Sequence, residues 1–177
     1  MDIKHTYIFE WVGPFYSIEE LKKWESTHKS YEYHSYVITG IPKNKSKERA
    51  YFGITQNKKK CVSARFNKDH HVRQMREIDI WIGKFSDPSK LSDRRNIELC
   101  ETMLISYCQP ELNKKKKAYY PPESIAIINR WFKLDLKPRE RILYSAQREI
   151  PDVLIYDREN KNIWGSYKIK KLLSVLD

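Results

Sequence analysis

An apolar stripe with helical spacing runs through the middle of the chain, and a carboxylate interrupts it. Between residues 92 and 108 the apolar side chains recur every three or four residues, which is the spacing of one helix face. Gln109-Pro110 follows and ends the predicted helix, because the residue before a proline disfavours helical geometry. On a helical wheel, Ile97 and Leu104 lie about 40° and 60° from Glu101. Glu101 is therefore predicted to lie in the middle of the apolar face.

This position of Glu101 has two interpretations. An ionised carboxylate that faces a core is costly unless a cation neutralises it. The first interpretation is an ion pair with an arginine or lysine from a neighbouring element. The second is a ligand for one divalent metal ion at the floor of a cleft, because Mg²⁺ accepts a single carboxylate and keeps most of its waters. The residue pattern alone leaves both open.

The residues before this helix predict a small antiparallel sheet. Two β-rich runs, 36–40 and 50–55, are separated by a polar loop and predict neighbouring antiparallel strands. Residues 78–85 predict a third strand. Residues 60–77 predict a helix, because three side chains recur there every fourth residue: Val62, Phe66 and His70. The predicted fold is α+β, with a three-stranded, mainly antiparallel sheet in a β-β-α-β-α core at 34–115, flanked by helices.

Two extensions flank this predicted core. Residues 1–33 contain an apolar stretch, expected to be a strand that covers the edge of the sheet, and then a helix. Ser17 and Glu20 form a capping box at the start of that helix. Residues 116–177 follow a lysine run. The elements predicted in this part are, in chain order, one or two helices around 123–133 and 138–147, a strand at 153–156, a turn, a strand at 163–164 and a short terminal helix.

The charge of the chain points to a polyanionic partner. Its 34 Lys and Arg against 23 Asp and Glu give a net charge of +11. A surplus of this size favours nucleic acid, although a basic protein can also bind acidic proteins or anionic membranes. No apolar run is long enough for a membrane-spanning helix, which excludes that class of membrane protein. Three scattered cysteines and no apolar leader predict reduced thiols and a cytoplasmic location.

Five short motifs follow one another in an order that resembles the GIY-YIG nuclease superfamily. In chain order they are His34-Ser35-Tyr36 with Val37-Ile38, Tyr51-Phe52-Gly53 with Thr55, Arg65, Glu101 with Leu104-Ile105, and Pro110-Glu111-Leu112-Asn113. The match covers residues 34–115. Its closest part is the pattern that starts at Glu101, because the family has a glutamate, then Leu-Ile, then Pro-x-x-Asn at this spacing.

Two positions depart from the family pattern. The first motif lacks its glycine, and Ser35 replaces the central isoleucine. The family histidine is expected four residues after the arginine, where this chain has Asp69. His70 and His71 follow directly, and His70 is taken as the residue for that role, with His71 and Asp69 as the other candidates.

The resemblance implies a metal-dependent endonuclease that hydrolyses phosphodiester bonds in DNA, expected to be double-stranded. One Mg²⁺ or Mn²⁺ ion would be held by Glu101 and would contact the scissile phosphate. Arg65 would bind the phosphate oxygens, and Tyr36 would hold or deprotonate the attacking water. A phenol has an ordinary pKa of about 10, so nearby cations must lower that pKa before it can act as a base.

Three further residues receive supporting roles from the resemblance. Tyr51 would hydrogen-bond a phosphate oxygen or its partner tyrosine, His70 would relay the proton, and Asn113 would hold the local loop and the glutamate helix. Each of the six residues also has an ordinary structural interpretation, such as a tyrosine that packs within a sheet or an arginine that pairs with an exposed carboxylate.

Two lysine runs bracket the proposed cleft in sequence and are candidates for contacts to the DNA backbone, or else are solvated charge runs. They comprise Lys58, Lys59 and Lys60 before the arginine, and Lys114, Lys115 and Lys116 after the asparagine. Residues 152–176 resemble the small DNA-binding modules appended to homing nucleases.

Two other functions compete with the endonuclease. A catalytically inactive nucleic-acid-binding module derived from the same fold would explain the lost glycine and the shifted histidine. A basic RNA-associated protein, with motifs that match by accident, is the other. Mg²⁺-dependent nicking of plasmid DNA, and its loss in Glu101→Ala, separates the endonuclease from both.

Overall fold

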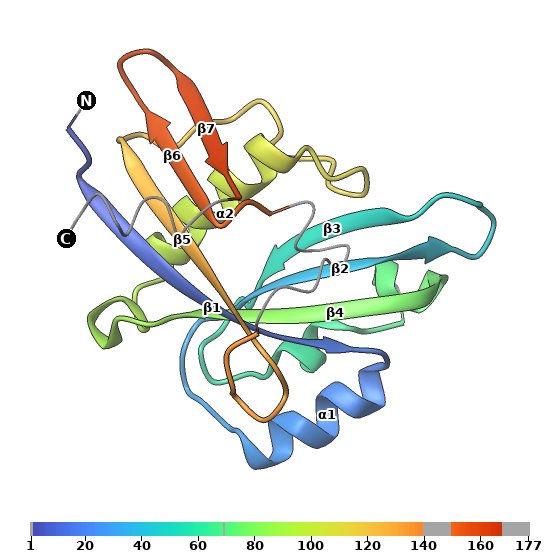
Figure 1. The fold of residues 1–177 in the computed structure, drawn as a ribbon. Coiled ribbons are helices and arrows are strands. Elements are labelled where there is room, and N and C mark those ends of the chain that lie inside the picture. Colours follow the sequence, from blue (N-terminus) through green and yellow to red (C-terminus); the bar gives the residue numbers. More distant parts are fainter. Residues whose placement is uncertain (1, 69, 140–149, 168–177) are drawn as a thin grey trace.

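The computed structural model describes residues 2–68, 70–139 and 150–167. Seven strands form one mixed sheet in the order β3-β2-β4-β1-β5-β6-β7 (Figure 1). These are β1 (His5–Phe15), β2 (Ser35–Pro42), β3 (Arg49–Ile54), β4 (Met75–Phe85), β5 (Ile125–Phe132), β6 (Val153–Asp157) and β7 (Asn162–Ser166). The described helices are α1 (Ile18–Thr27) and α2 (Arg94–Cys108), with 3-10 helices η1 (Val62–Arg65), η2 (His71–Gln74) and η3 (Pro88–Lys90).

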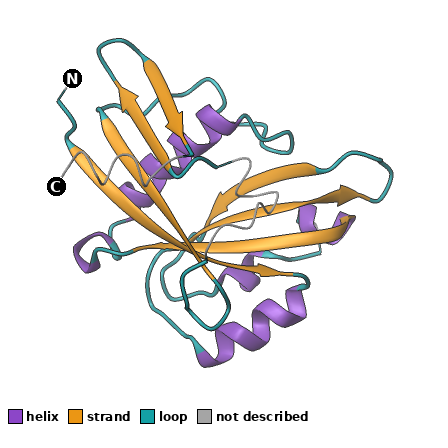
Figure 2. Cartoon of the chain, viewed as in Figure 1, coloured by secondary structure: helices purple, strands orange, loops and turns teal. Residues whose placement is uncertain are grey.

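The predicted fold class, an α+β core around a small three-stranded sheet, is wrong. The protein is mainly β, and its single seven-stranded sheet curls into a half-barrel, as Figure 2 shows. The reason lies in β1, which was expected to cover the sheet edge and instead lies in the middle. It pairs antiparallel with β4 on one side and parallel with β5 on the other. The strands on either side of 34–115 therefore extend the sheet.

The helix predicted near 123–133 is also wrong, because these residues form β5. Ile125, Ile127 and Ile128 are β-branched and favour strands, and a parallel strand buried on both faces reads as a nearly continuous apolar run. Asn129 secures this strand. Its side-chain oxygen accepts a hydrogen bond from the Trp11 indole N–H at 2.8 Å, and its amide nitrogen donates to the Pro151 carbonyl at 2.8 Å.

The helix predicted over 60–77 is replaced by η1, η2 and the first part of β4. Val62 and Phe66 are buried as their spacing suggested, but they extend from irregular backbone. The strands predicted at 36–40, 50–55 and 78–85 are confirmed, and so is the antiparallel pairing of the first two.

Several other element predictions are confirmed. α2 lies within the predicted helix at 92–108, and β6 and β7 match the predicted strand, turn and strand. The hydroxyl of Ser17 accepts a hydrogen bond from the Glu20 N–H at 3.0 Å, which is the predicted start of α1. Most of the predicted helix at 138–147, and the whole terminal helix, lie outside the described residues.

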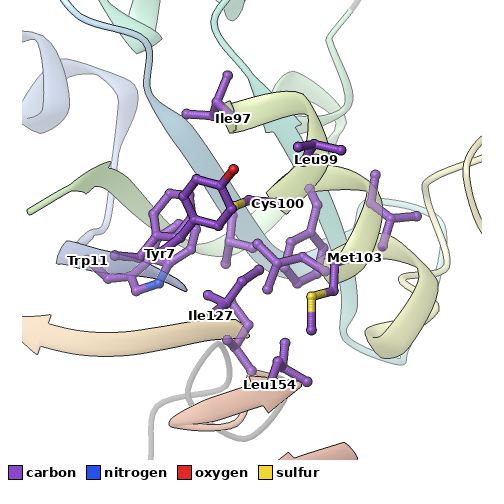
Figure 3. Packing of buried hydrophobic residues seen from close by; sticks show 14 of the residues in the cluster. Tyr7, Trp11, Ile97, Leu99, Cys100, Met103, Ile127 and Leu154 are labelled. Carbon is purple, nitrogen blue, oxygen red and sulfur yellow. The ribbon is translucent and has the colours of Figure 1, made fainter. Parts of the chain in front are cut away.

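Two apolar clusters cover the two faces of the sheet. On the first face the sheet curls around α2, and Figure 3 shows Ile97, Cys100 and Met103 of α2 packed with side chains from β1, β5 and β6. On the second face, α1, η1 and η2 cover β2 and β4, in a cluster that includes Tyr36 and Phe66. Neighbouring residues on a strand face opposite sides, so β2 contributes to both clusters. Within the described part of the chain, no helix combines the length and the apolar character needed to cross a membrane.

Candidate functional site

Two tyrosines and a histidine meet on the α1 side of the sheet. Tyr36 of β2 faces Gly53 of β3, and Tyr51 faces Ile38, so the two tyrosines are diagonal neighbours on one face. Their ring centroids lie 6.2 Å apart. His70 is the N-cap residue of η2, and its Nε2 lies 3.3 Å from the Tyr36 hydroxyl oxygen. Its ring also lies 5.3 Å from that of Tyr51. Three of the predicted site residues therefore form one cluster.

Gly53 provides the space that the Tyr36 ring occupies. A Cβ at this position would lie 2.5 Å from the Tyr36 hydroxyl oxygen and 2.5 Å from its Cζ. The Tyr36 side chain is fully buried, so it has little freedom to move aside. Gly53, in the second motif, is therefore needed to leave room for the ring of Tyr36, in the first motif.

We expect Gly53→Ala to displace Tyr36 and to lower the free energy of unfolding by about 1–3 kcal/mol, the usual cost of overpacking a core. Urea unfolding measures the loss. Gly40→Ala, on β2, is the control, because a Cβ there would meet its nearest neighbours at 3.1–3.2 Å and none of them belongs to Tyr36. Equal losses in the two variants would contradict this role of Gly53.

Arg65 ends η1 beside these rings. Its side chain is half-buried, and its buried Nε–H has no hydrogen-bond partner among the residues that the structure describes. A buried guanidinium N–H without a partner is costly and is suited to an anionic oxygen. The next residue, Phe66, packs its ring 5.4 Å from that of Tyr36 and 4.9 Å from that of His70, so η1 ends next to the cluster. The positive charge of Arg65 offsets part of the rise in pKa that burial causes at Tyr36 and Tyr51.

His70 is neutral at pH 7, and its hydrogen bonds define its tautomer. Burial lowers its pKa to about 4, and the charges of His71 and Arg65 add to this shift. Its Nδ1 accepts a hydrogen bond from the Val72 N–H at 3.3 Å, so the ring proton is assigned to Nε2. The Nε2–H then donates to the Tyr36 hydroxyl oxygen. His70 thus holds the Tyr36 hydroxyl in place. Of the other candidates for this role, His71 has its ring tilted against that of Tyr51 with the centroids 5.1 Å apart, and Asp69 lies outside the described residues.

The two phenols stay protonated in the protein alone. Burial is the largest cause that raises the pKa of Tyr36 well above its ordinary value, the charge of Tyr51 raises it further, and Arg65 offsets only part of this rise. Burial also raises the pKa of Tyr51, with a further contribution from the carboxylate of Glu101. The lowered phenol pKa expected for a base is therefore not present. Both hydroxyls are suited to donate hydrogen bonds at neutral pH.

Glu101 lies on α2, which covers the opposite face of the sheet from α1, and it carries an ion pair. Its side chain is 12% exposed, and its Oε2 accepts a hydrogen bond from the Lys116 Nζ at 2.6 Å. The buried face of α2 is centred on Cys100 and not on Glu101, because the curled sheet contacts the helix from several sides. Glu101 lies at the border of that face. Its negative charge adds to the rise in pKa that burial causes at Tyr36 and Tyr51.

The donor set around Glu101 suits a hydrated divalent ion better than a tightly caged one. Among the described residues, no group of three or more His, Cys, Asp or Glu side chains could hold a metal ion together. Zinc, which takes four nitrogen or sulfur ligands in structural sites, does not fit. Mg²⁺ fits, because it is commonly bound by one carboxylate, several waters and the phosphate oxygens of a substrate.

The segment after α2 closes the outer edge of β3. The Asn113 side chain accepts a hydrogen bond from the Phe52 N–H at 2.8 Å and donates one to the Phe52 carbonyl at 2.8 Å. Glu111 accepts from the Ala50 N–H, and the Leu112 N–H donates to the Ala50 carbonyl. The residues 111–113 therefore satisfy the outward backbone groups on both sides of Tyr51.

The predicted DNA-contacting lysines lie in different environments. Lys59, Lys60, Lys114 and Lys115 are exposed, and Lys58 is partly exposed. Lys116 is the exception, since its ammonium group binds Glu101.

One functional candidate was missed. Glu25 is a buried carboxylate on α1, on the face that also holds Ile18 and Leu21. The helical wheel that singled out Glu101 would have identified it too.

No family model, curated protein or solved structure matches the chain.

Proposed function

We propose that this chain is a metal-dependent endonuclease of the GIY-YIG type, which hydrolyses phosphodiester bonds in double-stranded DNA. The observation that supports this proposal most is the cluster of Tyr36, Tyr51 and His70, with Arg65 at the end of the turn packed beside it. A largely buried carboxylate, Glu101, acts on the pKa values of both phenols from α2. These side chains come from β2, β3, η1, η2 and α2.

Each described residue has a role that its protonation state permits. Arg65 binds the non-bridging oxygens of the scissile phosphate with its buried, unpartnered Nε–H. The Tyr51 hydroxyl donates a hydrogen bond to a phosphate oxygen. The Tyr36 hydroxyl, fixed by His70, holds the attacking water. Glu101 would hold a Mg²⁺ or Mn²⁺ ion, whose positive charge would be available to activate water and to stabilise negative charge on the phosphate oxygens.

The burial of the cluster makes these interactions effective. Tyr36 is fully buried, and Glu101 is 12% exposed. Charges and hydrogen bonds in such a site act through a lower effective dielectric than in water, so they stabilise the charge that develops on the phosphate more strongly. The hydrogen bonds from His70 and the β3 edge keep the phenols in position before substrate binds.

Plasmid cleavage tests the proposal. Supercoiled DNA is incubated with the protein and Mg²⁺ or Mn²⁺, and nicked and linear products are separated by electrophoresis. We expect cleavage that stops when EDTA removes the metal. A folded protein that binds the plasmid but leaves it intact with both metals would contradict the endonuclease.

The ion pair between Glu101 and Lys116 favours a second candidate, a nucleic-acid-binding module that does not cut. Lys116 has a backbone φ of 70°, in the left-handed region that side-chain-bearing residues seldom adopt. Its ammonium group nevertheless reaches the Glu101 carboxylate at 2.6 Å, where a metal ion would bind. In a module that binds without cutting, the ammonium group of Lys116 would neutralise Glu101 permanently, and no metal ion would bind there.

Mn²⁺ affinity of Lys116→Gln separates the two candidates. If the metal displaces Lys116, removing the lysine should tighten Mn²⁺ binding by about 1.5- to 5-fold, the equivalent of the 0.2–1 kcal/mol of a partly exposed ion pair. Isothermal titration of Mn²⁺ into each protein measures this. Lys115→Gln, with an exposed side chain one residue away, is the control for net charge. Failure of both the wild type and Lys116→Gln to bind Mn²⁺ would support the non-cutting module.

A further inference from the structure

Glu25 is a buried carboxylate that connects α1 to η1. The residue is 7% exposed. Its Oε1 accepts a hydrogen bond from the Val62 N–H at 2.7 Å, and its two oxygens lie 3.4 and 3.2 Å from the Ser63 nitrogen. Glu25 and Val62 are 37 residues apart in sequence. The carboxylate therefore holds together two segments that no strand pairing joins.

These contacts explain how a carboxylate is tolerated in this position. Burial raises the pKa of Glu25, whereas the hydrogen bonds from Ser63 and Val62 lower it and favour the ionised form. The first N–H groups of a helical turn have no partner within the turn, so they need an acceptor from elsewhere. Glu25 supplies that acceptor for both groups.

Because η1 is short, fixing its first residue, Val62, also limits the position of its last residue, Arg65. The turn has four residues, and Arg65 is its last. On one side of Arg65, Val62 is buried beneath α1, and on the other, Phe66 packs its ring 5.4 Å from that of Tyr36 and 4.9 Å from that of His70. A shift at the start of η1 therefore moves Arg65 relative to the phenols.

We propose that Glu25 is a positioning residue for Arg65, because its carboxylate fixes the start of η1 and thereby sets the guanidinium against Tyr36 and Tyr51. The proposal rests on the proposed function, since Arg65 needs positioning only if it binds a substrate phosphate. It also gives residues 1–33 a part in the site, although these residues lie outside the segment that carries the nuclease-like motifs.

Two variants separate positioning from stability. Glu25→Gln keeps the shape of the side chain, but its amide group has one acceptor oxygen in place of two, so it cannot hold both N–H groups equally well. Ser17→Ala is the matched control, because it removes the N-terminal cap of α1 at 3.0 Å and leaves the contacts of Glu25 with η1 in place. Urea unfolding establishes the stability of each.

Amide hydrogen exchange measures how firmly the first N–H groups of η1 are held, and it does not depend on catalytic activity. We expect Glu25→Gln to accelerate exchange at Val62 and Ser63 beyond the change that its global stability predicts. Ser17→Ala should change exchange at these two amides only in line with global stability. Unchanged exchange at both amides in Glu25→Gln would overturn the proposal.

A double-mutant cycle with Arg65 tests whether the effect runs through that residue. We expect Glu25→Gln to lower the rate constant of plasmid cleavage by about tenfold in the wild type, as a small misplacement of a substrate-binding group does. In an Arg65→Ala background, where residual cleavage is followed at high enzyme concentration, the same change should have less than about a twofold effect. Additive effects would overturn the proposal.

The two possible failures are distinguishable. A wild type that does not cut DNA contradicts the proposed function, and the role of Glu25 falls with it. A wild type that cuts, with Glu25→Gln no slower than Ser17→Ala, contradicts the role of Glu25 alone.

Discussion

Glu101→Gln is expected to reduce Mg²⁺-dependent plasmid cleavage by about 10²–10³-fold, the usual cost of removing one group that stabilises a charged transition state. Glutamine has nearly the shape of glutamate but lacks its charge, so it holds a divalent cation poorly. The neutral side chain also frees Lys116, which is now paired with the carboxylate at 2.6 Å. DNA affinity should therefore stay the same or rise. A loss of cleavage with DNA binding retained would assign the defect to chemistry.

The control for this experiment lies on the same helix. Glu98 of α2 is partly exposed and pairs with Arg94 at 2.7 Å, one turn earlier. Glu98→Gln removes the same charge from α2 at a position away from the phenols. We expect it to cleave plasmid within about twofold of the wild type, because exposed ion pairs contribute little. Equal cleavage by Glu101→Gln and Glu98→Gln would rule out Glu101 as the metal ligand.

Asn113→Ala is expected to lower the free energy of unfolding by about 2–4 kcal/mol. The substitution leaves the N–H and the carbonyl of Phe52, both now bound at 2.8 Å, without partners in a buried setting. Each unsatisfied buried group costs roughly 1–3 kcal/mol. Because Phe52 is next to Tyr51 on β3, the loosened edge should also slow cleavage. Urea unfolding and the plasmid assay measure the two effects.

Lys114→Ala is the comparison for this prediction. Lys114 follows Asn113 directly and is exposed. Its replacement should change the free energy of unfolding by less than about 0.5 kcal/mol, as is usual for surface positions. If Asn113→Ala proved as stable as Lys114→Ala, the closure of the β3 edge by residues 111–113 would not be the stabilising contact described above.

The sequence could predict the elements whose signals are local. The strands at 36–40, 50–55 and 78–85 and the helix at 92–108 each have their own periodicity, and they were found. The central place of β1 could not be predicted, because it depends on pairing His5 with Ile125, far along the chain. The β-branched side chains of Ile125, Ile127 and Ile128 favour a strand, and the helix prediction near 123–133 took no account of them.

The site residues also divide into those whose positions follow from local sequence and those whose positions depend on distant contacts. The positions of Tyr36 and Tyr51 follow from the local pairing of β2 with β3, so a sequence argument could bring them together. The spacing of Val62, Phe66 and His70 is that of a helix, although the described residues of this segment form only short 3-10 turns. Apolar spacing does not reveal that a distant carboxylate, Glu25, stabilises the first of these turns. The partner of Glu101 was equally hidden. That partner is Lys116, which has a left-handed backbone conformation, and nothing in the sequence distinguishes it from the other lysines of its run.

The place of β1 between β4 and β5 limits how the protein can be trimmed. A fragment reduced to 34–115 would lose the strand that pairs with the second half of β4, and alternate amide and carbonyl groups between Ile80 and Phe85 would face solvent unpaired. Bare edges of this kind recruit strands from other molecules. Anyone who wishes to graft these side chains onto a different protein must transplant the first strand of the chain together with the motifs.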